Sequence, residues 1–448
     1  MPNILIVSDD CRIPTGVGGQ SAEIIKGLTK KGNKLFQVSP HFQDRPATTF
    51  VHKFDTGEEV VIYSSKKYDD ADLILKIVRK QKIDAVILFT DPHRFINIFL
   101  NYRAISNVCP IIYYTIWDSW LNADKDGKPH YNSFIYQSCN HLACISRQTQ
   151  SFVDTIVNRL PESERPKVSY LPHGVDPAIY RPLPPEQVAG FRKQFFNGNE
   201  FDFVVLFNSR NQGRKKCPDL IYSYAQFAKT LPAEQQKKMA LVLHTDPIAD
   251  TGTNLMEVIQ ALAPHLNVYI DGSKGTNEQI NMLYNICDLL VLPSNAEGFG
   301  LTPLEFVMSG GVTAVSVVGG LQDQCNLLDA EGQPVLYSDR FTGKTSQNIV
   351  SHGSWVYPIV PQAYEIIGNP ATPYLENGIV SHEGIQNALS YWYNIPKEER
   401  KKRGLEGRNW FIENGFTAQS MVEGFDKVIK DTIANAKKTK LFEVYISQ

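Results

Sequence analysis

Short apolar runs alternate with stretches of helical pattern from the first residues of the chain onward. ILIV (4–7) has the length of a buried strand, and GGQSAEIIKGLTKKGN (18–33) has the pattern of a helix closed by a Gly-Asn turn. Further buried-strand patterns stand at 84–89, 110–116, 141–146 and 168–174. Such alternation is typical of a parallel sheet with helices on both faces. The chain is therefore predicted to have an α/β fold.

A proline-rich stretch, DPAIYRPLPPEQ (176–187), interrupts this alternation and is interpreted as a linker. The alternation then restarts, with strand patterns at 203–210, 240–245, 267–271 and 289–293 and helical patterns from about 219 and 277. We therefore predict two doubly wound, Rossmann-like domains, 1–182 and 183–424. The stretch from about 321 to 377 is rich in Gly, Pro, Ser and aromatic residues and is interpreted as an insertion in the second domain.

The composition of the chain does not point to one particular class of binding partner. The 448 residues carry a formal net charge of −2, which does not suggest a basic body built for polyanions. The seven cysteines are scattered without CxxC spacing, so neither a zinc site nor a disulfide framework is expected. The first residues lack the basic start of a signal peptide, and no window approaches the ~20 apolar residues of a membrane span. A cytoplasmic protein without an integral membrane segment is the expectation.

The loops that follow the strands are where a ligand is expected. In open parallel sheets, ligands collect outside the carboxyl ends of the strands. With two such units facing each other, the cleft between them is the expected site.

Two glutamates, Glu297 and Glu305, flank one of these loops in LVLPSNAEGFGLTPLEFVMSGG (290–311). A structural explanation exists for Glu305, because Thr302 as N-cap and Pro303 at the first helical position would complete a capping box with it. Glu297 could equally be a solvated loop residue.

A ligand explains the same stretch differently. The loop GFGL (Gly298, Phe299, Gly300, Leu301) supplies backbone N–H groups at a helix N-terminus, which favours a phosphate. Carboxylates on either side would accept hydrogen bonds from the hydroxyls of a sugar or ribose. The combination indicates a phosphate-bearing, polyhydroxyl ligand.

EGFGLTPLE, preceded by CDLLVLPS, resembles the E-x7-E signature of retaining glycosyltransferases of family 4, which have the GT-B fold. YLPHGVDPAIYRP (170–182) and LACISRQTQSFV look like the interdomain segment of that family and the strand before it. The resemblance covers most of the chain apart from 321–377. It implies two Rossmann-like domains facing across a cleft, with a last helix (about 425–448) that packs back on the first domain.

The resemblance also implies roles for these residues. Glu305 would hold the ribose of a nucleotide-sugar donor and Glu297 the transferred sugar, with the 298–301 backbone at the phosphates. In LFNSRNQGRKK, the pattern of an arginine followed five positions later by a lysine implies Arg210 and Lys215 as the diphosphate pair. They would stabilise the leaving diphosphate. A shift of one position would select Lys216, and a plain solvated basic run is the structural alternative.

The first domain offers candidates for the other side of the cleft. RIPTGVGGQ (12–20) is not a GxGxxG pattern, so a dinucleotide cofactor is not indicated, but Gly18 and Gly19 suit close approach to a phosphate or sugar. A plain strand-helix turn is the alternative. Many family members carry a histidine where YYTIWDSW has Trp117, followed by Asp118.

That departure changes the expected contacts on the acceptor side. Asp118 is predicted as the polar contact to donor sugar or acceptor, and Trp117 as a stacking or packing wall. His93 is a further acceptor-side candidate, whereas His173 is expected to serve the hinge. DDAD (69–72) suits a helix start better than a metal site, and no metal is predicted.

The sequence thus predicts a retaining glycosyltransferase that moves a sugar from a UDP- or GDP-linked donor to a hydroxyl of a glycan or small molecule. The nucleotide sugar is a co-substrate, and no cofactor is expected. Three alternatives stay open. They are a nucleotide-sugar epimerase of the same architecture, a non-catalytic sugar-nucleotide-binding protein, and a transferase that acts on modified bases of viral DNA, with nucleic acid entering only as the acceptor.

Overall fold

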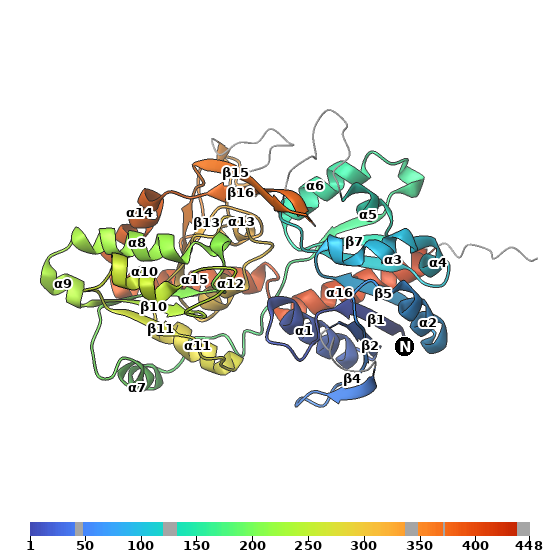
Figure 1. Ribbon diagram of the computed structural model, residues 1–448, viewed down its shortest axis with the longest axis horizontal. Helices are drawn as coiled ribbons and strands as arrows, with labels where there is room; N and C mark the ends of the chain where they lie inside the picture. The colour runs from blue at the N-terminus through green and yellow to red at the C-terminus, as the bar shows by residue number, and fades with distance from the viewer. Residues whose placement is uncertain (41–47, 120–131, 337–347, 371, 437–448) are drawn as a thin grey trace, which may run out of the picture.

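The computed structural model describes residues 1–40, 48–119, 132–336, 348–370 and 372–436. Two large sheets of mostly parallel strands form its two halves, which lie side by side in Figure 1. We call the part built on the first sheet, together with the helix α16, the first half. The part built on the second sheet is the second half.

The first sheet has the strand order β3-β4-β2-β1-β5-β6-β7-β8, and all neighbours are parallel except β3 and β4. Its strands are β1 (Asn3–Ser8), β2 (Lys34–Ser39), β3 (Thr49–Lys53), β4 (Glu59–Ser64), β5 (Ala85–Phe89), β6 (Ile111–Thr115), β7 (His141–Cys144) and β8 (Lys167–Tyr170). Between them lie α1 (Gly16–Lys30), α2 (Ala71–Gln81), η1 (Pro92–Phe95), α3 (Ile96–Leu100), α4 (Tyr102–Ser106), α5 (Ser133–Gln137), α6 (Arg147–Val157) and η2 (Glu162–Glu164). The strands β5 and β6 are buried along their whole length, as expected for the middle of a parallel sheet.

The second sheet is parallel throughout, in the order β11-β10-β9-β12-β13-β14. Its strands are β9 (Phe203–Asn208), β10 (Met239–His244), β11 (Val268–Asp271), β12 (Leu289–Leu292), β13 (Val312–Ser316) and β14 (Val356–Ile359). The helices are α7 (Pro185–Phe195), η3 (Gly213–Lys215), α8 (Cys217–Lys229), α9 (Ala233–Lys237), α10 (Leu255–Leu262), α11 (Asn277–Ile286), α12 (Leu301–Met308), α13 (Leu321–Gln324), α14 (His382–Asn394) and α15 (Lys397–Glu413).

The stretch interpreted as an insertion contains more than one kind of structure. Its strand β14 pairs with β13 and completes the second sheet. After it, β15 (Ala363–Asn369) and β16 (Thr372–Ile379) form a separate antiparallel hairpin. Part of this stretch therefore belongs to the sheet itself.

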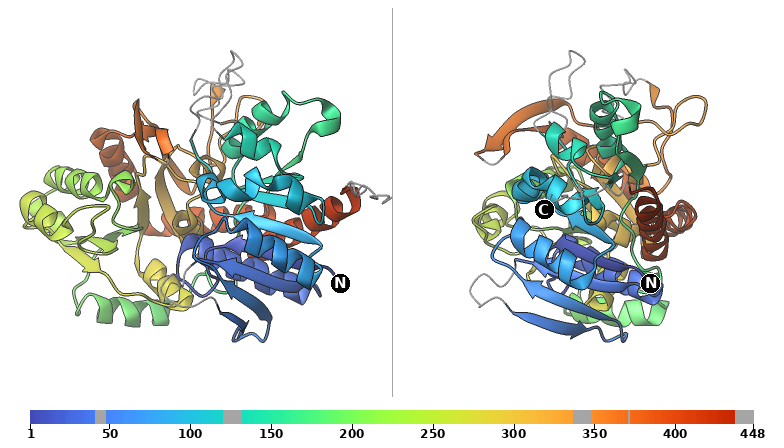
Figure 2. Two further views of the ribbon diagram at one scale, coloured as in Figure 1. Left: turned by 45° about the vertical axis from the view of Figure 1, so that its right-hand side comes forward. Right: turned by 90° about the vertical axis from the view of Figure 1, so that its right-hand side faces the viewer.

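The chain passes between the halves at two adjoining places. Val175 and Ala418 lie side by side there, because Val175 N–H donates to Phe416 O (3.2 Å) and Ala418 N–H donates to Val175 O (3.0 Å). The helix α16 (Ala418–Asn435) then packs against α1, and the views of Figure 2 place it in the half that holds the N-terminus. Gly27 permits this contact, since a Cβ there would meet Val422 at 2.3 Å. Among the helices of the described residues, none is long and apolar enough to cross a lipid bilayer.

Candidate active site

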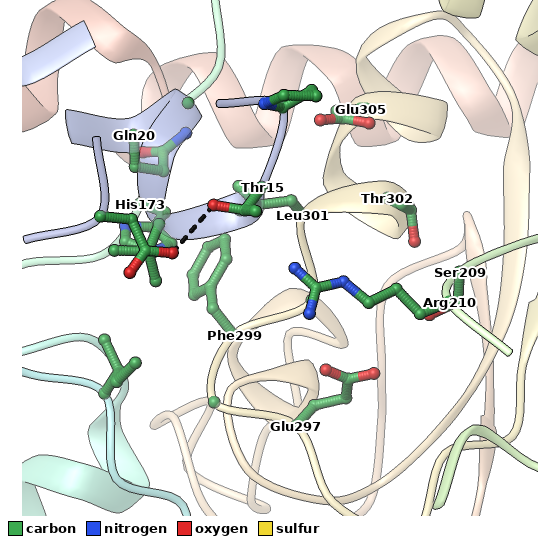
Figure 3. Close-up of a pocket in the computed structure, with 18 of the residues that line it drawn as sticks. Thr15, Gln20, His173, Ser209, Arg210, Glu297, Phe299, Leu301, Thr302 and Glu305 are labelled. Atoms are coloured by element: carbon green, nitrogen blue, oxygen red, sulfur yellow. Dashed lines mark hydrogen bonds between the residues drawn. The ribbon is translucent and has the colours of Figure 1, made fainter. Parts of the chain in front are cut away.

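The carboxyl ends of strands from both sheets open onto one cleft of about 1330 Å³. Loops after β1, β5 and β6 line it from the first half, and loops after β9, β10, β11 and β12 line it from the second. Figure 3 shows part of this lining. The cleft is where ligands of doubly wound folds collect.

A buried ion pair stands at the centre of the second-half wall. Lys215 Nζ donates to Glu297 Oε1, which also accepts from Ser294 Oγ at 2.9 Å. The side chains of Lys215 and Glu297 are 9% and 8% exposed, and Arg214 Nη1 lies 3.7 Å from Glu297 Oε2. Burial acts to raise the pKa of Glu297, but Lys215 and Arg214 outweigh it and lower that pKa. Glu297 is therefore an ionised carboxylate at neutral pH.

The loop between the glutamates opens α12 without a side-chain cap. Gly300 is the N-cap residue, in the left-handed region at φ 86°, and the helix starts at Leu301. The predicted capping box is wrong, because this turn places Thr302 inside the helix and leaves its side chain without a capping hydrogen bond. The first N–H groups of α12 lie at the cleft, where they and the helix dipole favour an anion.

Glu305 is held by a tyrosine and does not cap the helix. Tyr284 Oη donates to Glu305 Oε2 at 2.6 Å and accepts from Asn208 Nδ2 at 2.7 Å. Burial raises the pKa of Glu305, and the hydroxyls of Tyr284 and Tyr180 offset part of that rise. The carboxylate borders the cleft, so it is oriented from behind by protein and open to a ligand in front.

Most basic residues of the run after β9 line the cleft, but Lys216 does not. The side chain of Arg210 is exposed and points into the cleft between Glu297 and Glu305 (Figure 3). Arg214 also lines the cleft and donates to the Ala296 carbonyl. Lys216 is the N-cap residue of α8, in a left-handed conformation (φ 57°), and lies outside the lining of the cleft. Arg214 lies in the basic run LFNSRNQGRKK but was not predicted as a member of the diphosphate pair.

Carboxylates line the opposite wall. Asp9, Asp91 and Asp118 follow β1, β5 and β6, which are neighbours in the sheet. Asp9 accepts hydrogen bonds from Tyr68 Oη (2.5 Å) and Thr15 Oγ1 (3.0 Å). Burial raises the pKa of Asp118 to about 6, against the opposing effect of Arg214, and burial also raises the pKa of Asp91. Of the three, only Asp118 was predicted from the sequence as a site residue.

Aromatic and imidazole groups complete the first-half wall. Trp117 borders the cleft but is 4% exposed and packs in the apolar cluster of the first half. His93 lies on η1 at the cleft, and burial lowers its pKa. Its Nδ1 has no hydrogen-bond partner within the described part of the chain. His173 is buried beside Tyr114 Oη (2.8 Å), and burial lowers its pKa to about 3, so it is neutral.

The two glycines at the start of α1 differ in position. Gly19 lines the cleft, and a Cβ there would meet nothing within 4 Å. Gly18 does not line it, and a Cβ at Gly18 would lie 2.5 Å from Ile13 O. Gly18 thus serves the tight packing of the loop, whereas Gly19 leaves room at the cleft.

The acidic stretch DDAD (69–72) has a structural role at the start of α2. Asp70 caps α2 by accepting from Leu73 N–H at 3.1 Å. Within the described ranges, no three His, Cys, Asp or Glu side chains group as metal ligands.

The geometry defines a class of protein. Two parallel-sheet halves with a cleft at their carboxyl edges have the GT-B glycosyltransferase fold, and this confirms the predicted fold class. A glycosyltransferase from Rickettsia africae ESF-5 superimposes with a TM-score of 0.67 at 16% identity, covering 97% of this chain and 99% of that one. Anabaena HepE in complex with UDP and glucose gives 0.64 at 14% identity, covering 96% and 100%. Sucrose-phosphate synthase from Thermosynechococcus elongatus gives 0.67 at 14% identity, covering 97% and 100%.

Sequence comparison finds a match to a family model over part of the second half. Residues 191–329 match the family model described as "Glycosyl transferases group 1". The chain is 28% identical over 149 residues to the serotype-specific mannosyltransferase WbdA of Escherichia coli, covering 33% of this chain and 17% of that protein. It is 24% identical over 233 residues to D-inositol 3-phosphate glycosyltransferase of Stackebrandtia nassauensis, covering 45% and 51%. The matches thus span about a sixth of the first relative and about half of the second.

Proposed function

We propose that this protein is a retaining glycosyltransferase of family 4, which transfers a sugar from a nucleotide-diphosphate sugar to a hydroxyl acceptor. The observation that carries the proposal is the second-half wall. There Arg210, Arg214 and the uncapped start of α12 gather around one space, flanked by the Glu297 and Glu305 carboxylates. Cations and helix N–H groups suit a diphosphate, and the carboxylates suit the hydroxyls on either side of it.

The donor contacts follow from this arrangement. Glu305, fixed by Tyr284, accepts from the ribose hydroxyls, and Glu297 accepts from hydroxyls of the transferred sugar. The backbone of Gly298–Leu301 and the side chain of Arg210 hold the diphosphate. Lys215 acts mainly through Glu297, because its ammonium is already paired with that carboxylate. Gly19 leaves space for the donor from the other wall, and Gly18 shapes the loop behind it.

The acceptor is assigned to the first-half wall, residues 1–182, and the donor to 183–424. In the reaction the acceptor oxygen bonds to the anomeric carbon while the bond from that carbon to the diphosphate oxygen breaks on the same face. The acceptor proton passes to the leaving phosphate oxygen, and Arg210 and Arg214 stabilise the charge on the diphosphate. Asp118 orients the acceptor hydroxyl, with His93 and Trp117 nearby.

The names of similar proteins support a sugar-nucleotide donor. HepE structures are described in complex with UDP and glucose and with UDP-glucose, and WbdA is a mannosyltransferase. We propose a UDP- or GDP-linked sugar for this chain, and the HepE complexes support the UDP-linked one. We propose a glycan or small-molecule hydroxyl as the acceptor. The carboxylates of the first-half wall would repel a nucleic acid, because its phosphates carry negative charge.

Product stereochemistry tests this proposal. The protein is incubated with each nucleotide sugar and a panel of glycoside acceptors, and the product is followed by proton NMR. Transfer with the anomeric configuration of the donor is expected, and Glu297→Gln should abolish it. Inverted product would contradict retention. Conversion of the donor sugar without any acceptor would instead support an epimerase, and binding without turnover would support a sugar-nucleotide-binding protein.

A further inference from the structure

The β15–β16 hairpin is attached beside the donor loop. Gly378 N–H donates to Asn295 O at 2.9 Å, and Asn295 Nδ2 donates to Glu365 Oε1 at 3.3 Å. Asn295 lies two residues before Glu297. Its position is fixed in turn by its own N–H, which donates to Arg214 O at 2.8 Å. The base of the hairpin is therefore fixed to the segment that carries the donor-side carboxylate.

From this base the hairpin reaches the first half. Figure 1 shows β15 and β16 extending from the second half toward α5 and α6. Leu375 packs against the apolar cluster of the first half that contains Trp117. Glu376 N–H donates to Ser119 Oγ at 3.0 Å, and Ser119 is the neighbour of Asp118. The hairpin thus joins the two walls of the cleft next to the carboxylate assigned to the acceptor.

Two apolar residues of the hairpin, Ile367 and Leu375, border the cleft on the face that also carries the polar pair Glu365 and Asn377. Ile367 and Leu375 are register partners across β15 and β16, so their side chains lie on the same face. Both line the cleft, together with Thr372. Ile367 is 40% exposed, which is a large open area for an isoleucine inside a cleft. Ile366 points to the other face, because successive residues of a strand alternate.

The hairpin lies on the acceptor side of the proposed donor position. It follows β14, which is at the opposite edge of the second sheet from β11. The diphosphate contacts come from the loops after β9 and β12 in the middle of the sheet. The hairpin instead contacts the first half beside Asp118. A donor held by Glu305 and Arg210 therefore leaves the space under Ile367 and Leu375 to the acceptor.

We propose that Ile367 and Leu375 form an apolar wall of the acceptor subsite and that the acceptor is a glycoside carrying an apolar group. The inference rests on the proposed function. The sugar hydroxyl meets Asp118, while the apolar group lies along the hairpin, where contact removes the exposed surface of Ile367 from water. The second half thus selects the acceptor as well as binding the donor.

Equilibrium binding tests this selection. Octyl and methyl α-mannopyranoside are titrated into the full chain saturated with UDP or GDP, whichever binds, and followed by saturation-transfer NMR. The octyl glycoside is expected to bind at least tenfold more tightly. Ile367→Asp should remove that advantage and leave nucleotide affinity unchanged. Ile366→Asp, on the other face of the same strand, should preserve the advantage and serves as the matched control.

The outcomes separate this inference from the proposed function. Equal affinity for the two glycosides in the wild-type protein, or an octyl advantage that survives Ile367→Asp, would overturn the apolar wall while nucleotide binding still supported a transferase. Loss of the advantage in both Ile366→Asp and Ile367→Asp would also overturn it, because the effect would then not depend on the cleft face. Failure of every nucleotide to bind would contradict the proposed function itself.

Discussion

The two walls of the cleft have the same architecture but place different groups near its centre. Each is the carboxyl edge of a parallel sheet, with loops that lead into helices. The first-half wall presents the carboxylates of Asp9, Asp91 and Asp118, and the second-half wall presents Arg210, Arg214 and the start of α12. A doubly wound sheet therefore fixes where a ligand binds, and the residues after its strands decide which ligand.

The same contrast appears in how charge is balanced. In the second half, the buried Glu297 carboxylate is paired with Lys215, and its pKa is lowered. In the first half, the Asp118 carboxylate has a pKa raised to about 6, because burial outweighs the nearby Arg214. We expect Glu297 to keep its charge at neutral pH and Asp118 to change its charge near pH 6.

The largest expected effect comes from breaking the buried pair. Lys215→Met leaves the Glu297 carboxylate buried without its main partner and should lower the free energy of unfolding by about 3–5 kcal/mol. Lys215→Met combined with Glu297→Gln should recover at least half of that loss. Urea unfolding measures both, with Lys237→Met in the exposed pair with Glu234 as a control that changes nothing measurable. Equal losses in the single and double variants would contradict a coupled pair.

The next largest effect tests whether the second-half wall binds an anion, the diphosphate of the donor. Arg210→Ala should weaken nucleotide-sugar binding by about 10- to 100-fold, the loss of a charged hydrogen bond, without lowering stability, since the side chain is exposed. Lys216→Ala is the matched control, because Lys216 is a neighbouring cation that does not line the cleft. If both variants weakened binding to the same degree, a general basic surface would replace the specific contact.

The pH response tests the first wall. An ionised Asp118 is needed to accept the acceptor hydroxyl, so kcat/KM should rise with pH through about 6. Asp118→Asn should lose at least about tenfold in kcat/KM and show no such rise. A rise of the same size and midpoint in the variant would assign it to another group.

The same carboxyl has a consequence for stability. Its folded pKa of about 6 lies above the ordinary value of 3.8, so between these values the folded state keeps a proton that the unfolded chain has released. Its contribution to stability is therefore full below pH 3.8 and is lost as pH rises through 6. Asp118→Asn should gain thermal stability relative to the wild-type protein at pH 7.5 and not at pH 4.

The smallest effect concerns ribose. If Glu305 accepts from the ribose hydroxyls, the wild-type protein should prefer a ribonucleoside diphosphate to its 2′,3′-dideoxy analogue by about tenfold. Glu305→Gln should reduce this preference, because a neutral amide oxygen is a weaker acceptor than a carboxylate. An unchanged preference, with only a stability change, would return Glu305 to a structural role.

The sequence predicted the parts of the fold that depend on continuous apolar runs. The strands β1, β5, β6, β7 and β9 to β12 lie where such runs were found. The strands β2, β3 and β4, on one side of the first sheet, were not predicted. Gln37 and His52 interrupt the apolar pattern of β2 and β3, whereas β4 contains the uninterrupted run VVIY (60–63) and was missed. Interruption by polar residues is expected where one face of a strand meets water or a polar neighbour.

The site was predicted less completely, for two physical reasons. The capping box at Thr302 was inferred from residue types alone, but the left-handed Gly300 starts the helix earlier. Asp9 and Asp91 were missed because their meeting with Asp118 depends on the strand order β1-β5-β6, which connects distant parts of the chain. The roles of Glu297, Glu305, Arg210 and the other predicted residues stay predictions until binding is measured.

Isothermal titration of UDP-, GDP- and ADP-sugars, each with its free nucleotide, tests the central claim most directly. We predict that one nucleotide series binds tightly, that the free diphosphate retains most of the affinity, and that Arg210→Ala weakens both while Lys216→Ala does not. Absence of binding in every series by the folded wild-type protein would contradict the assignment of the second wall to a nucleotide-sugar donor.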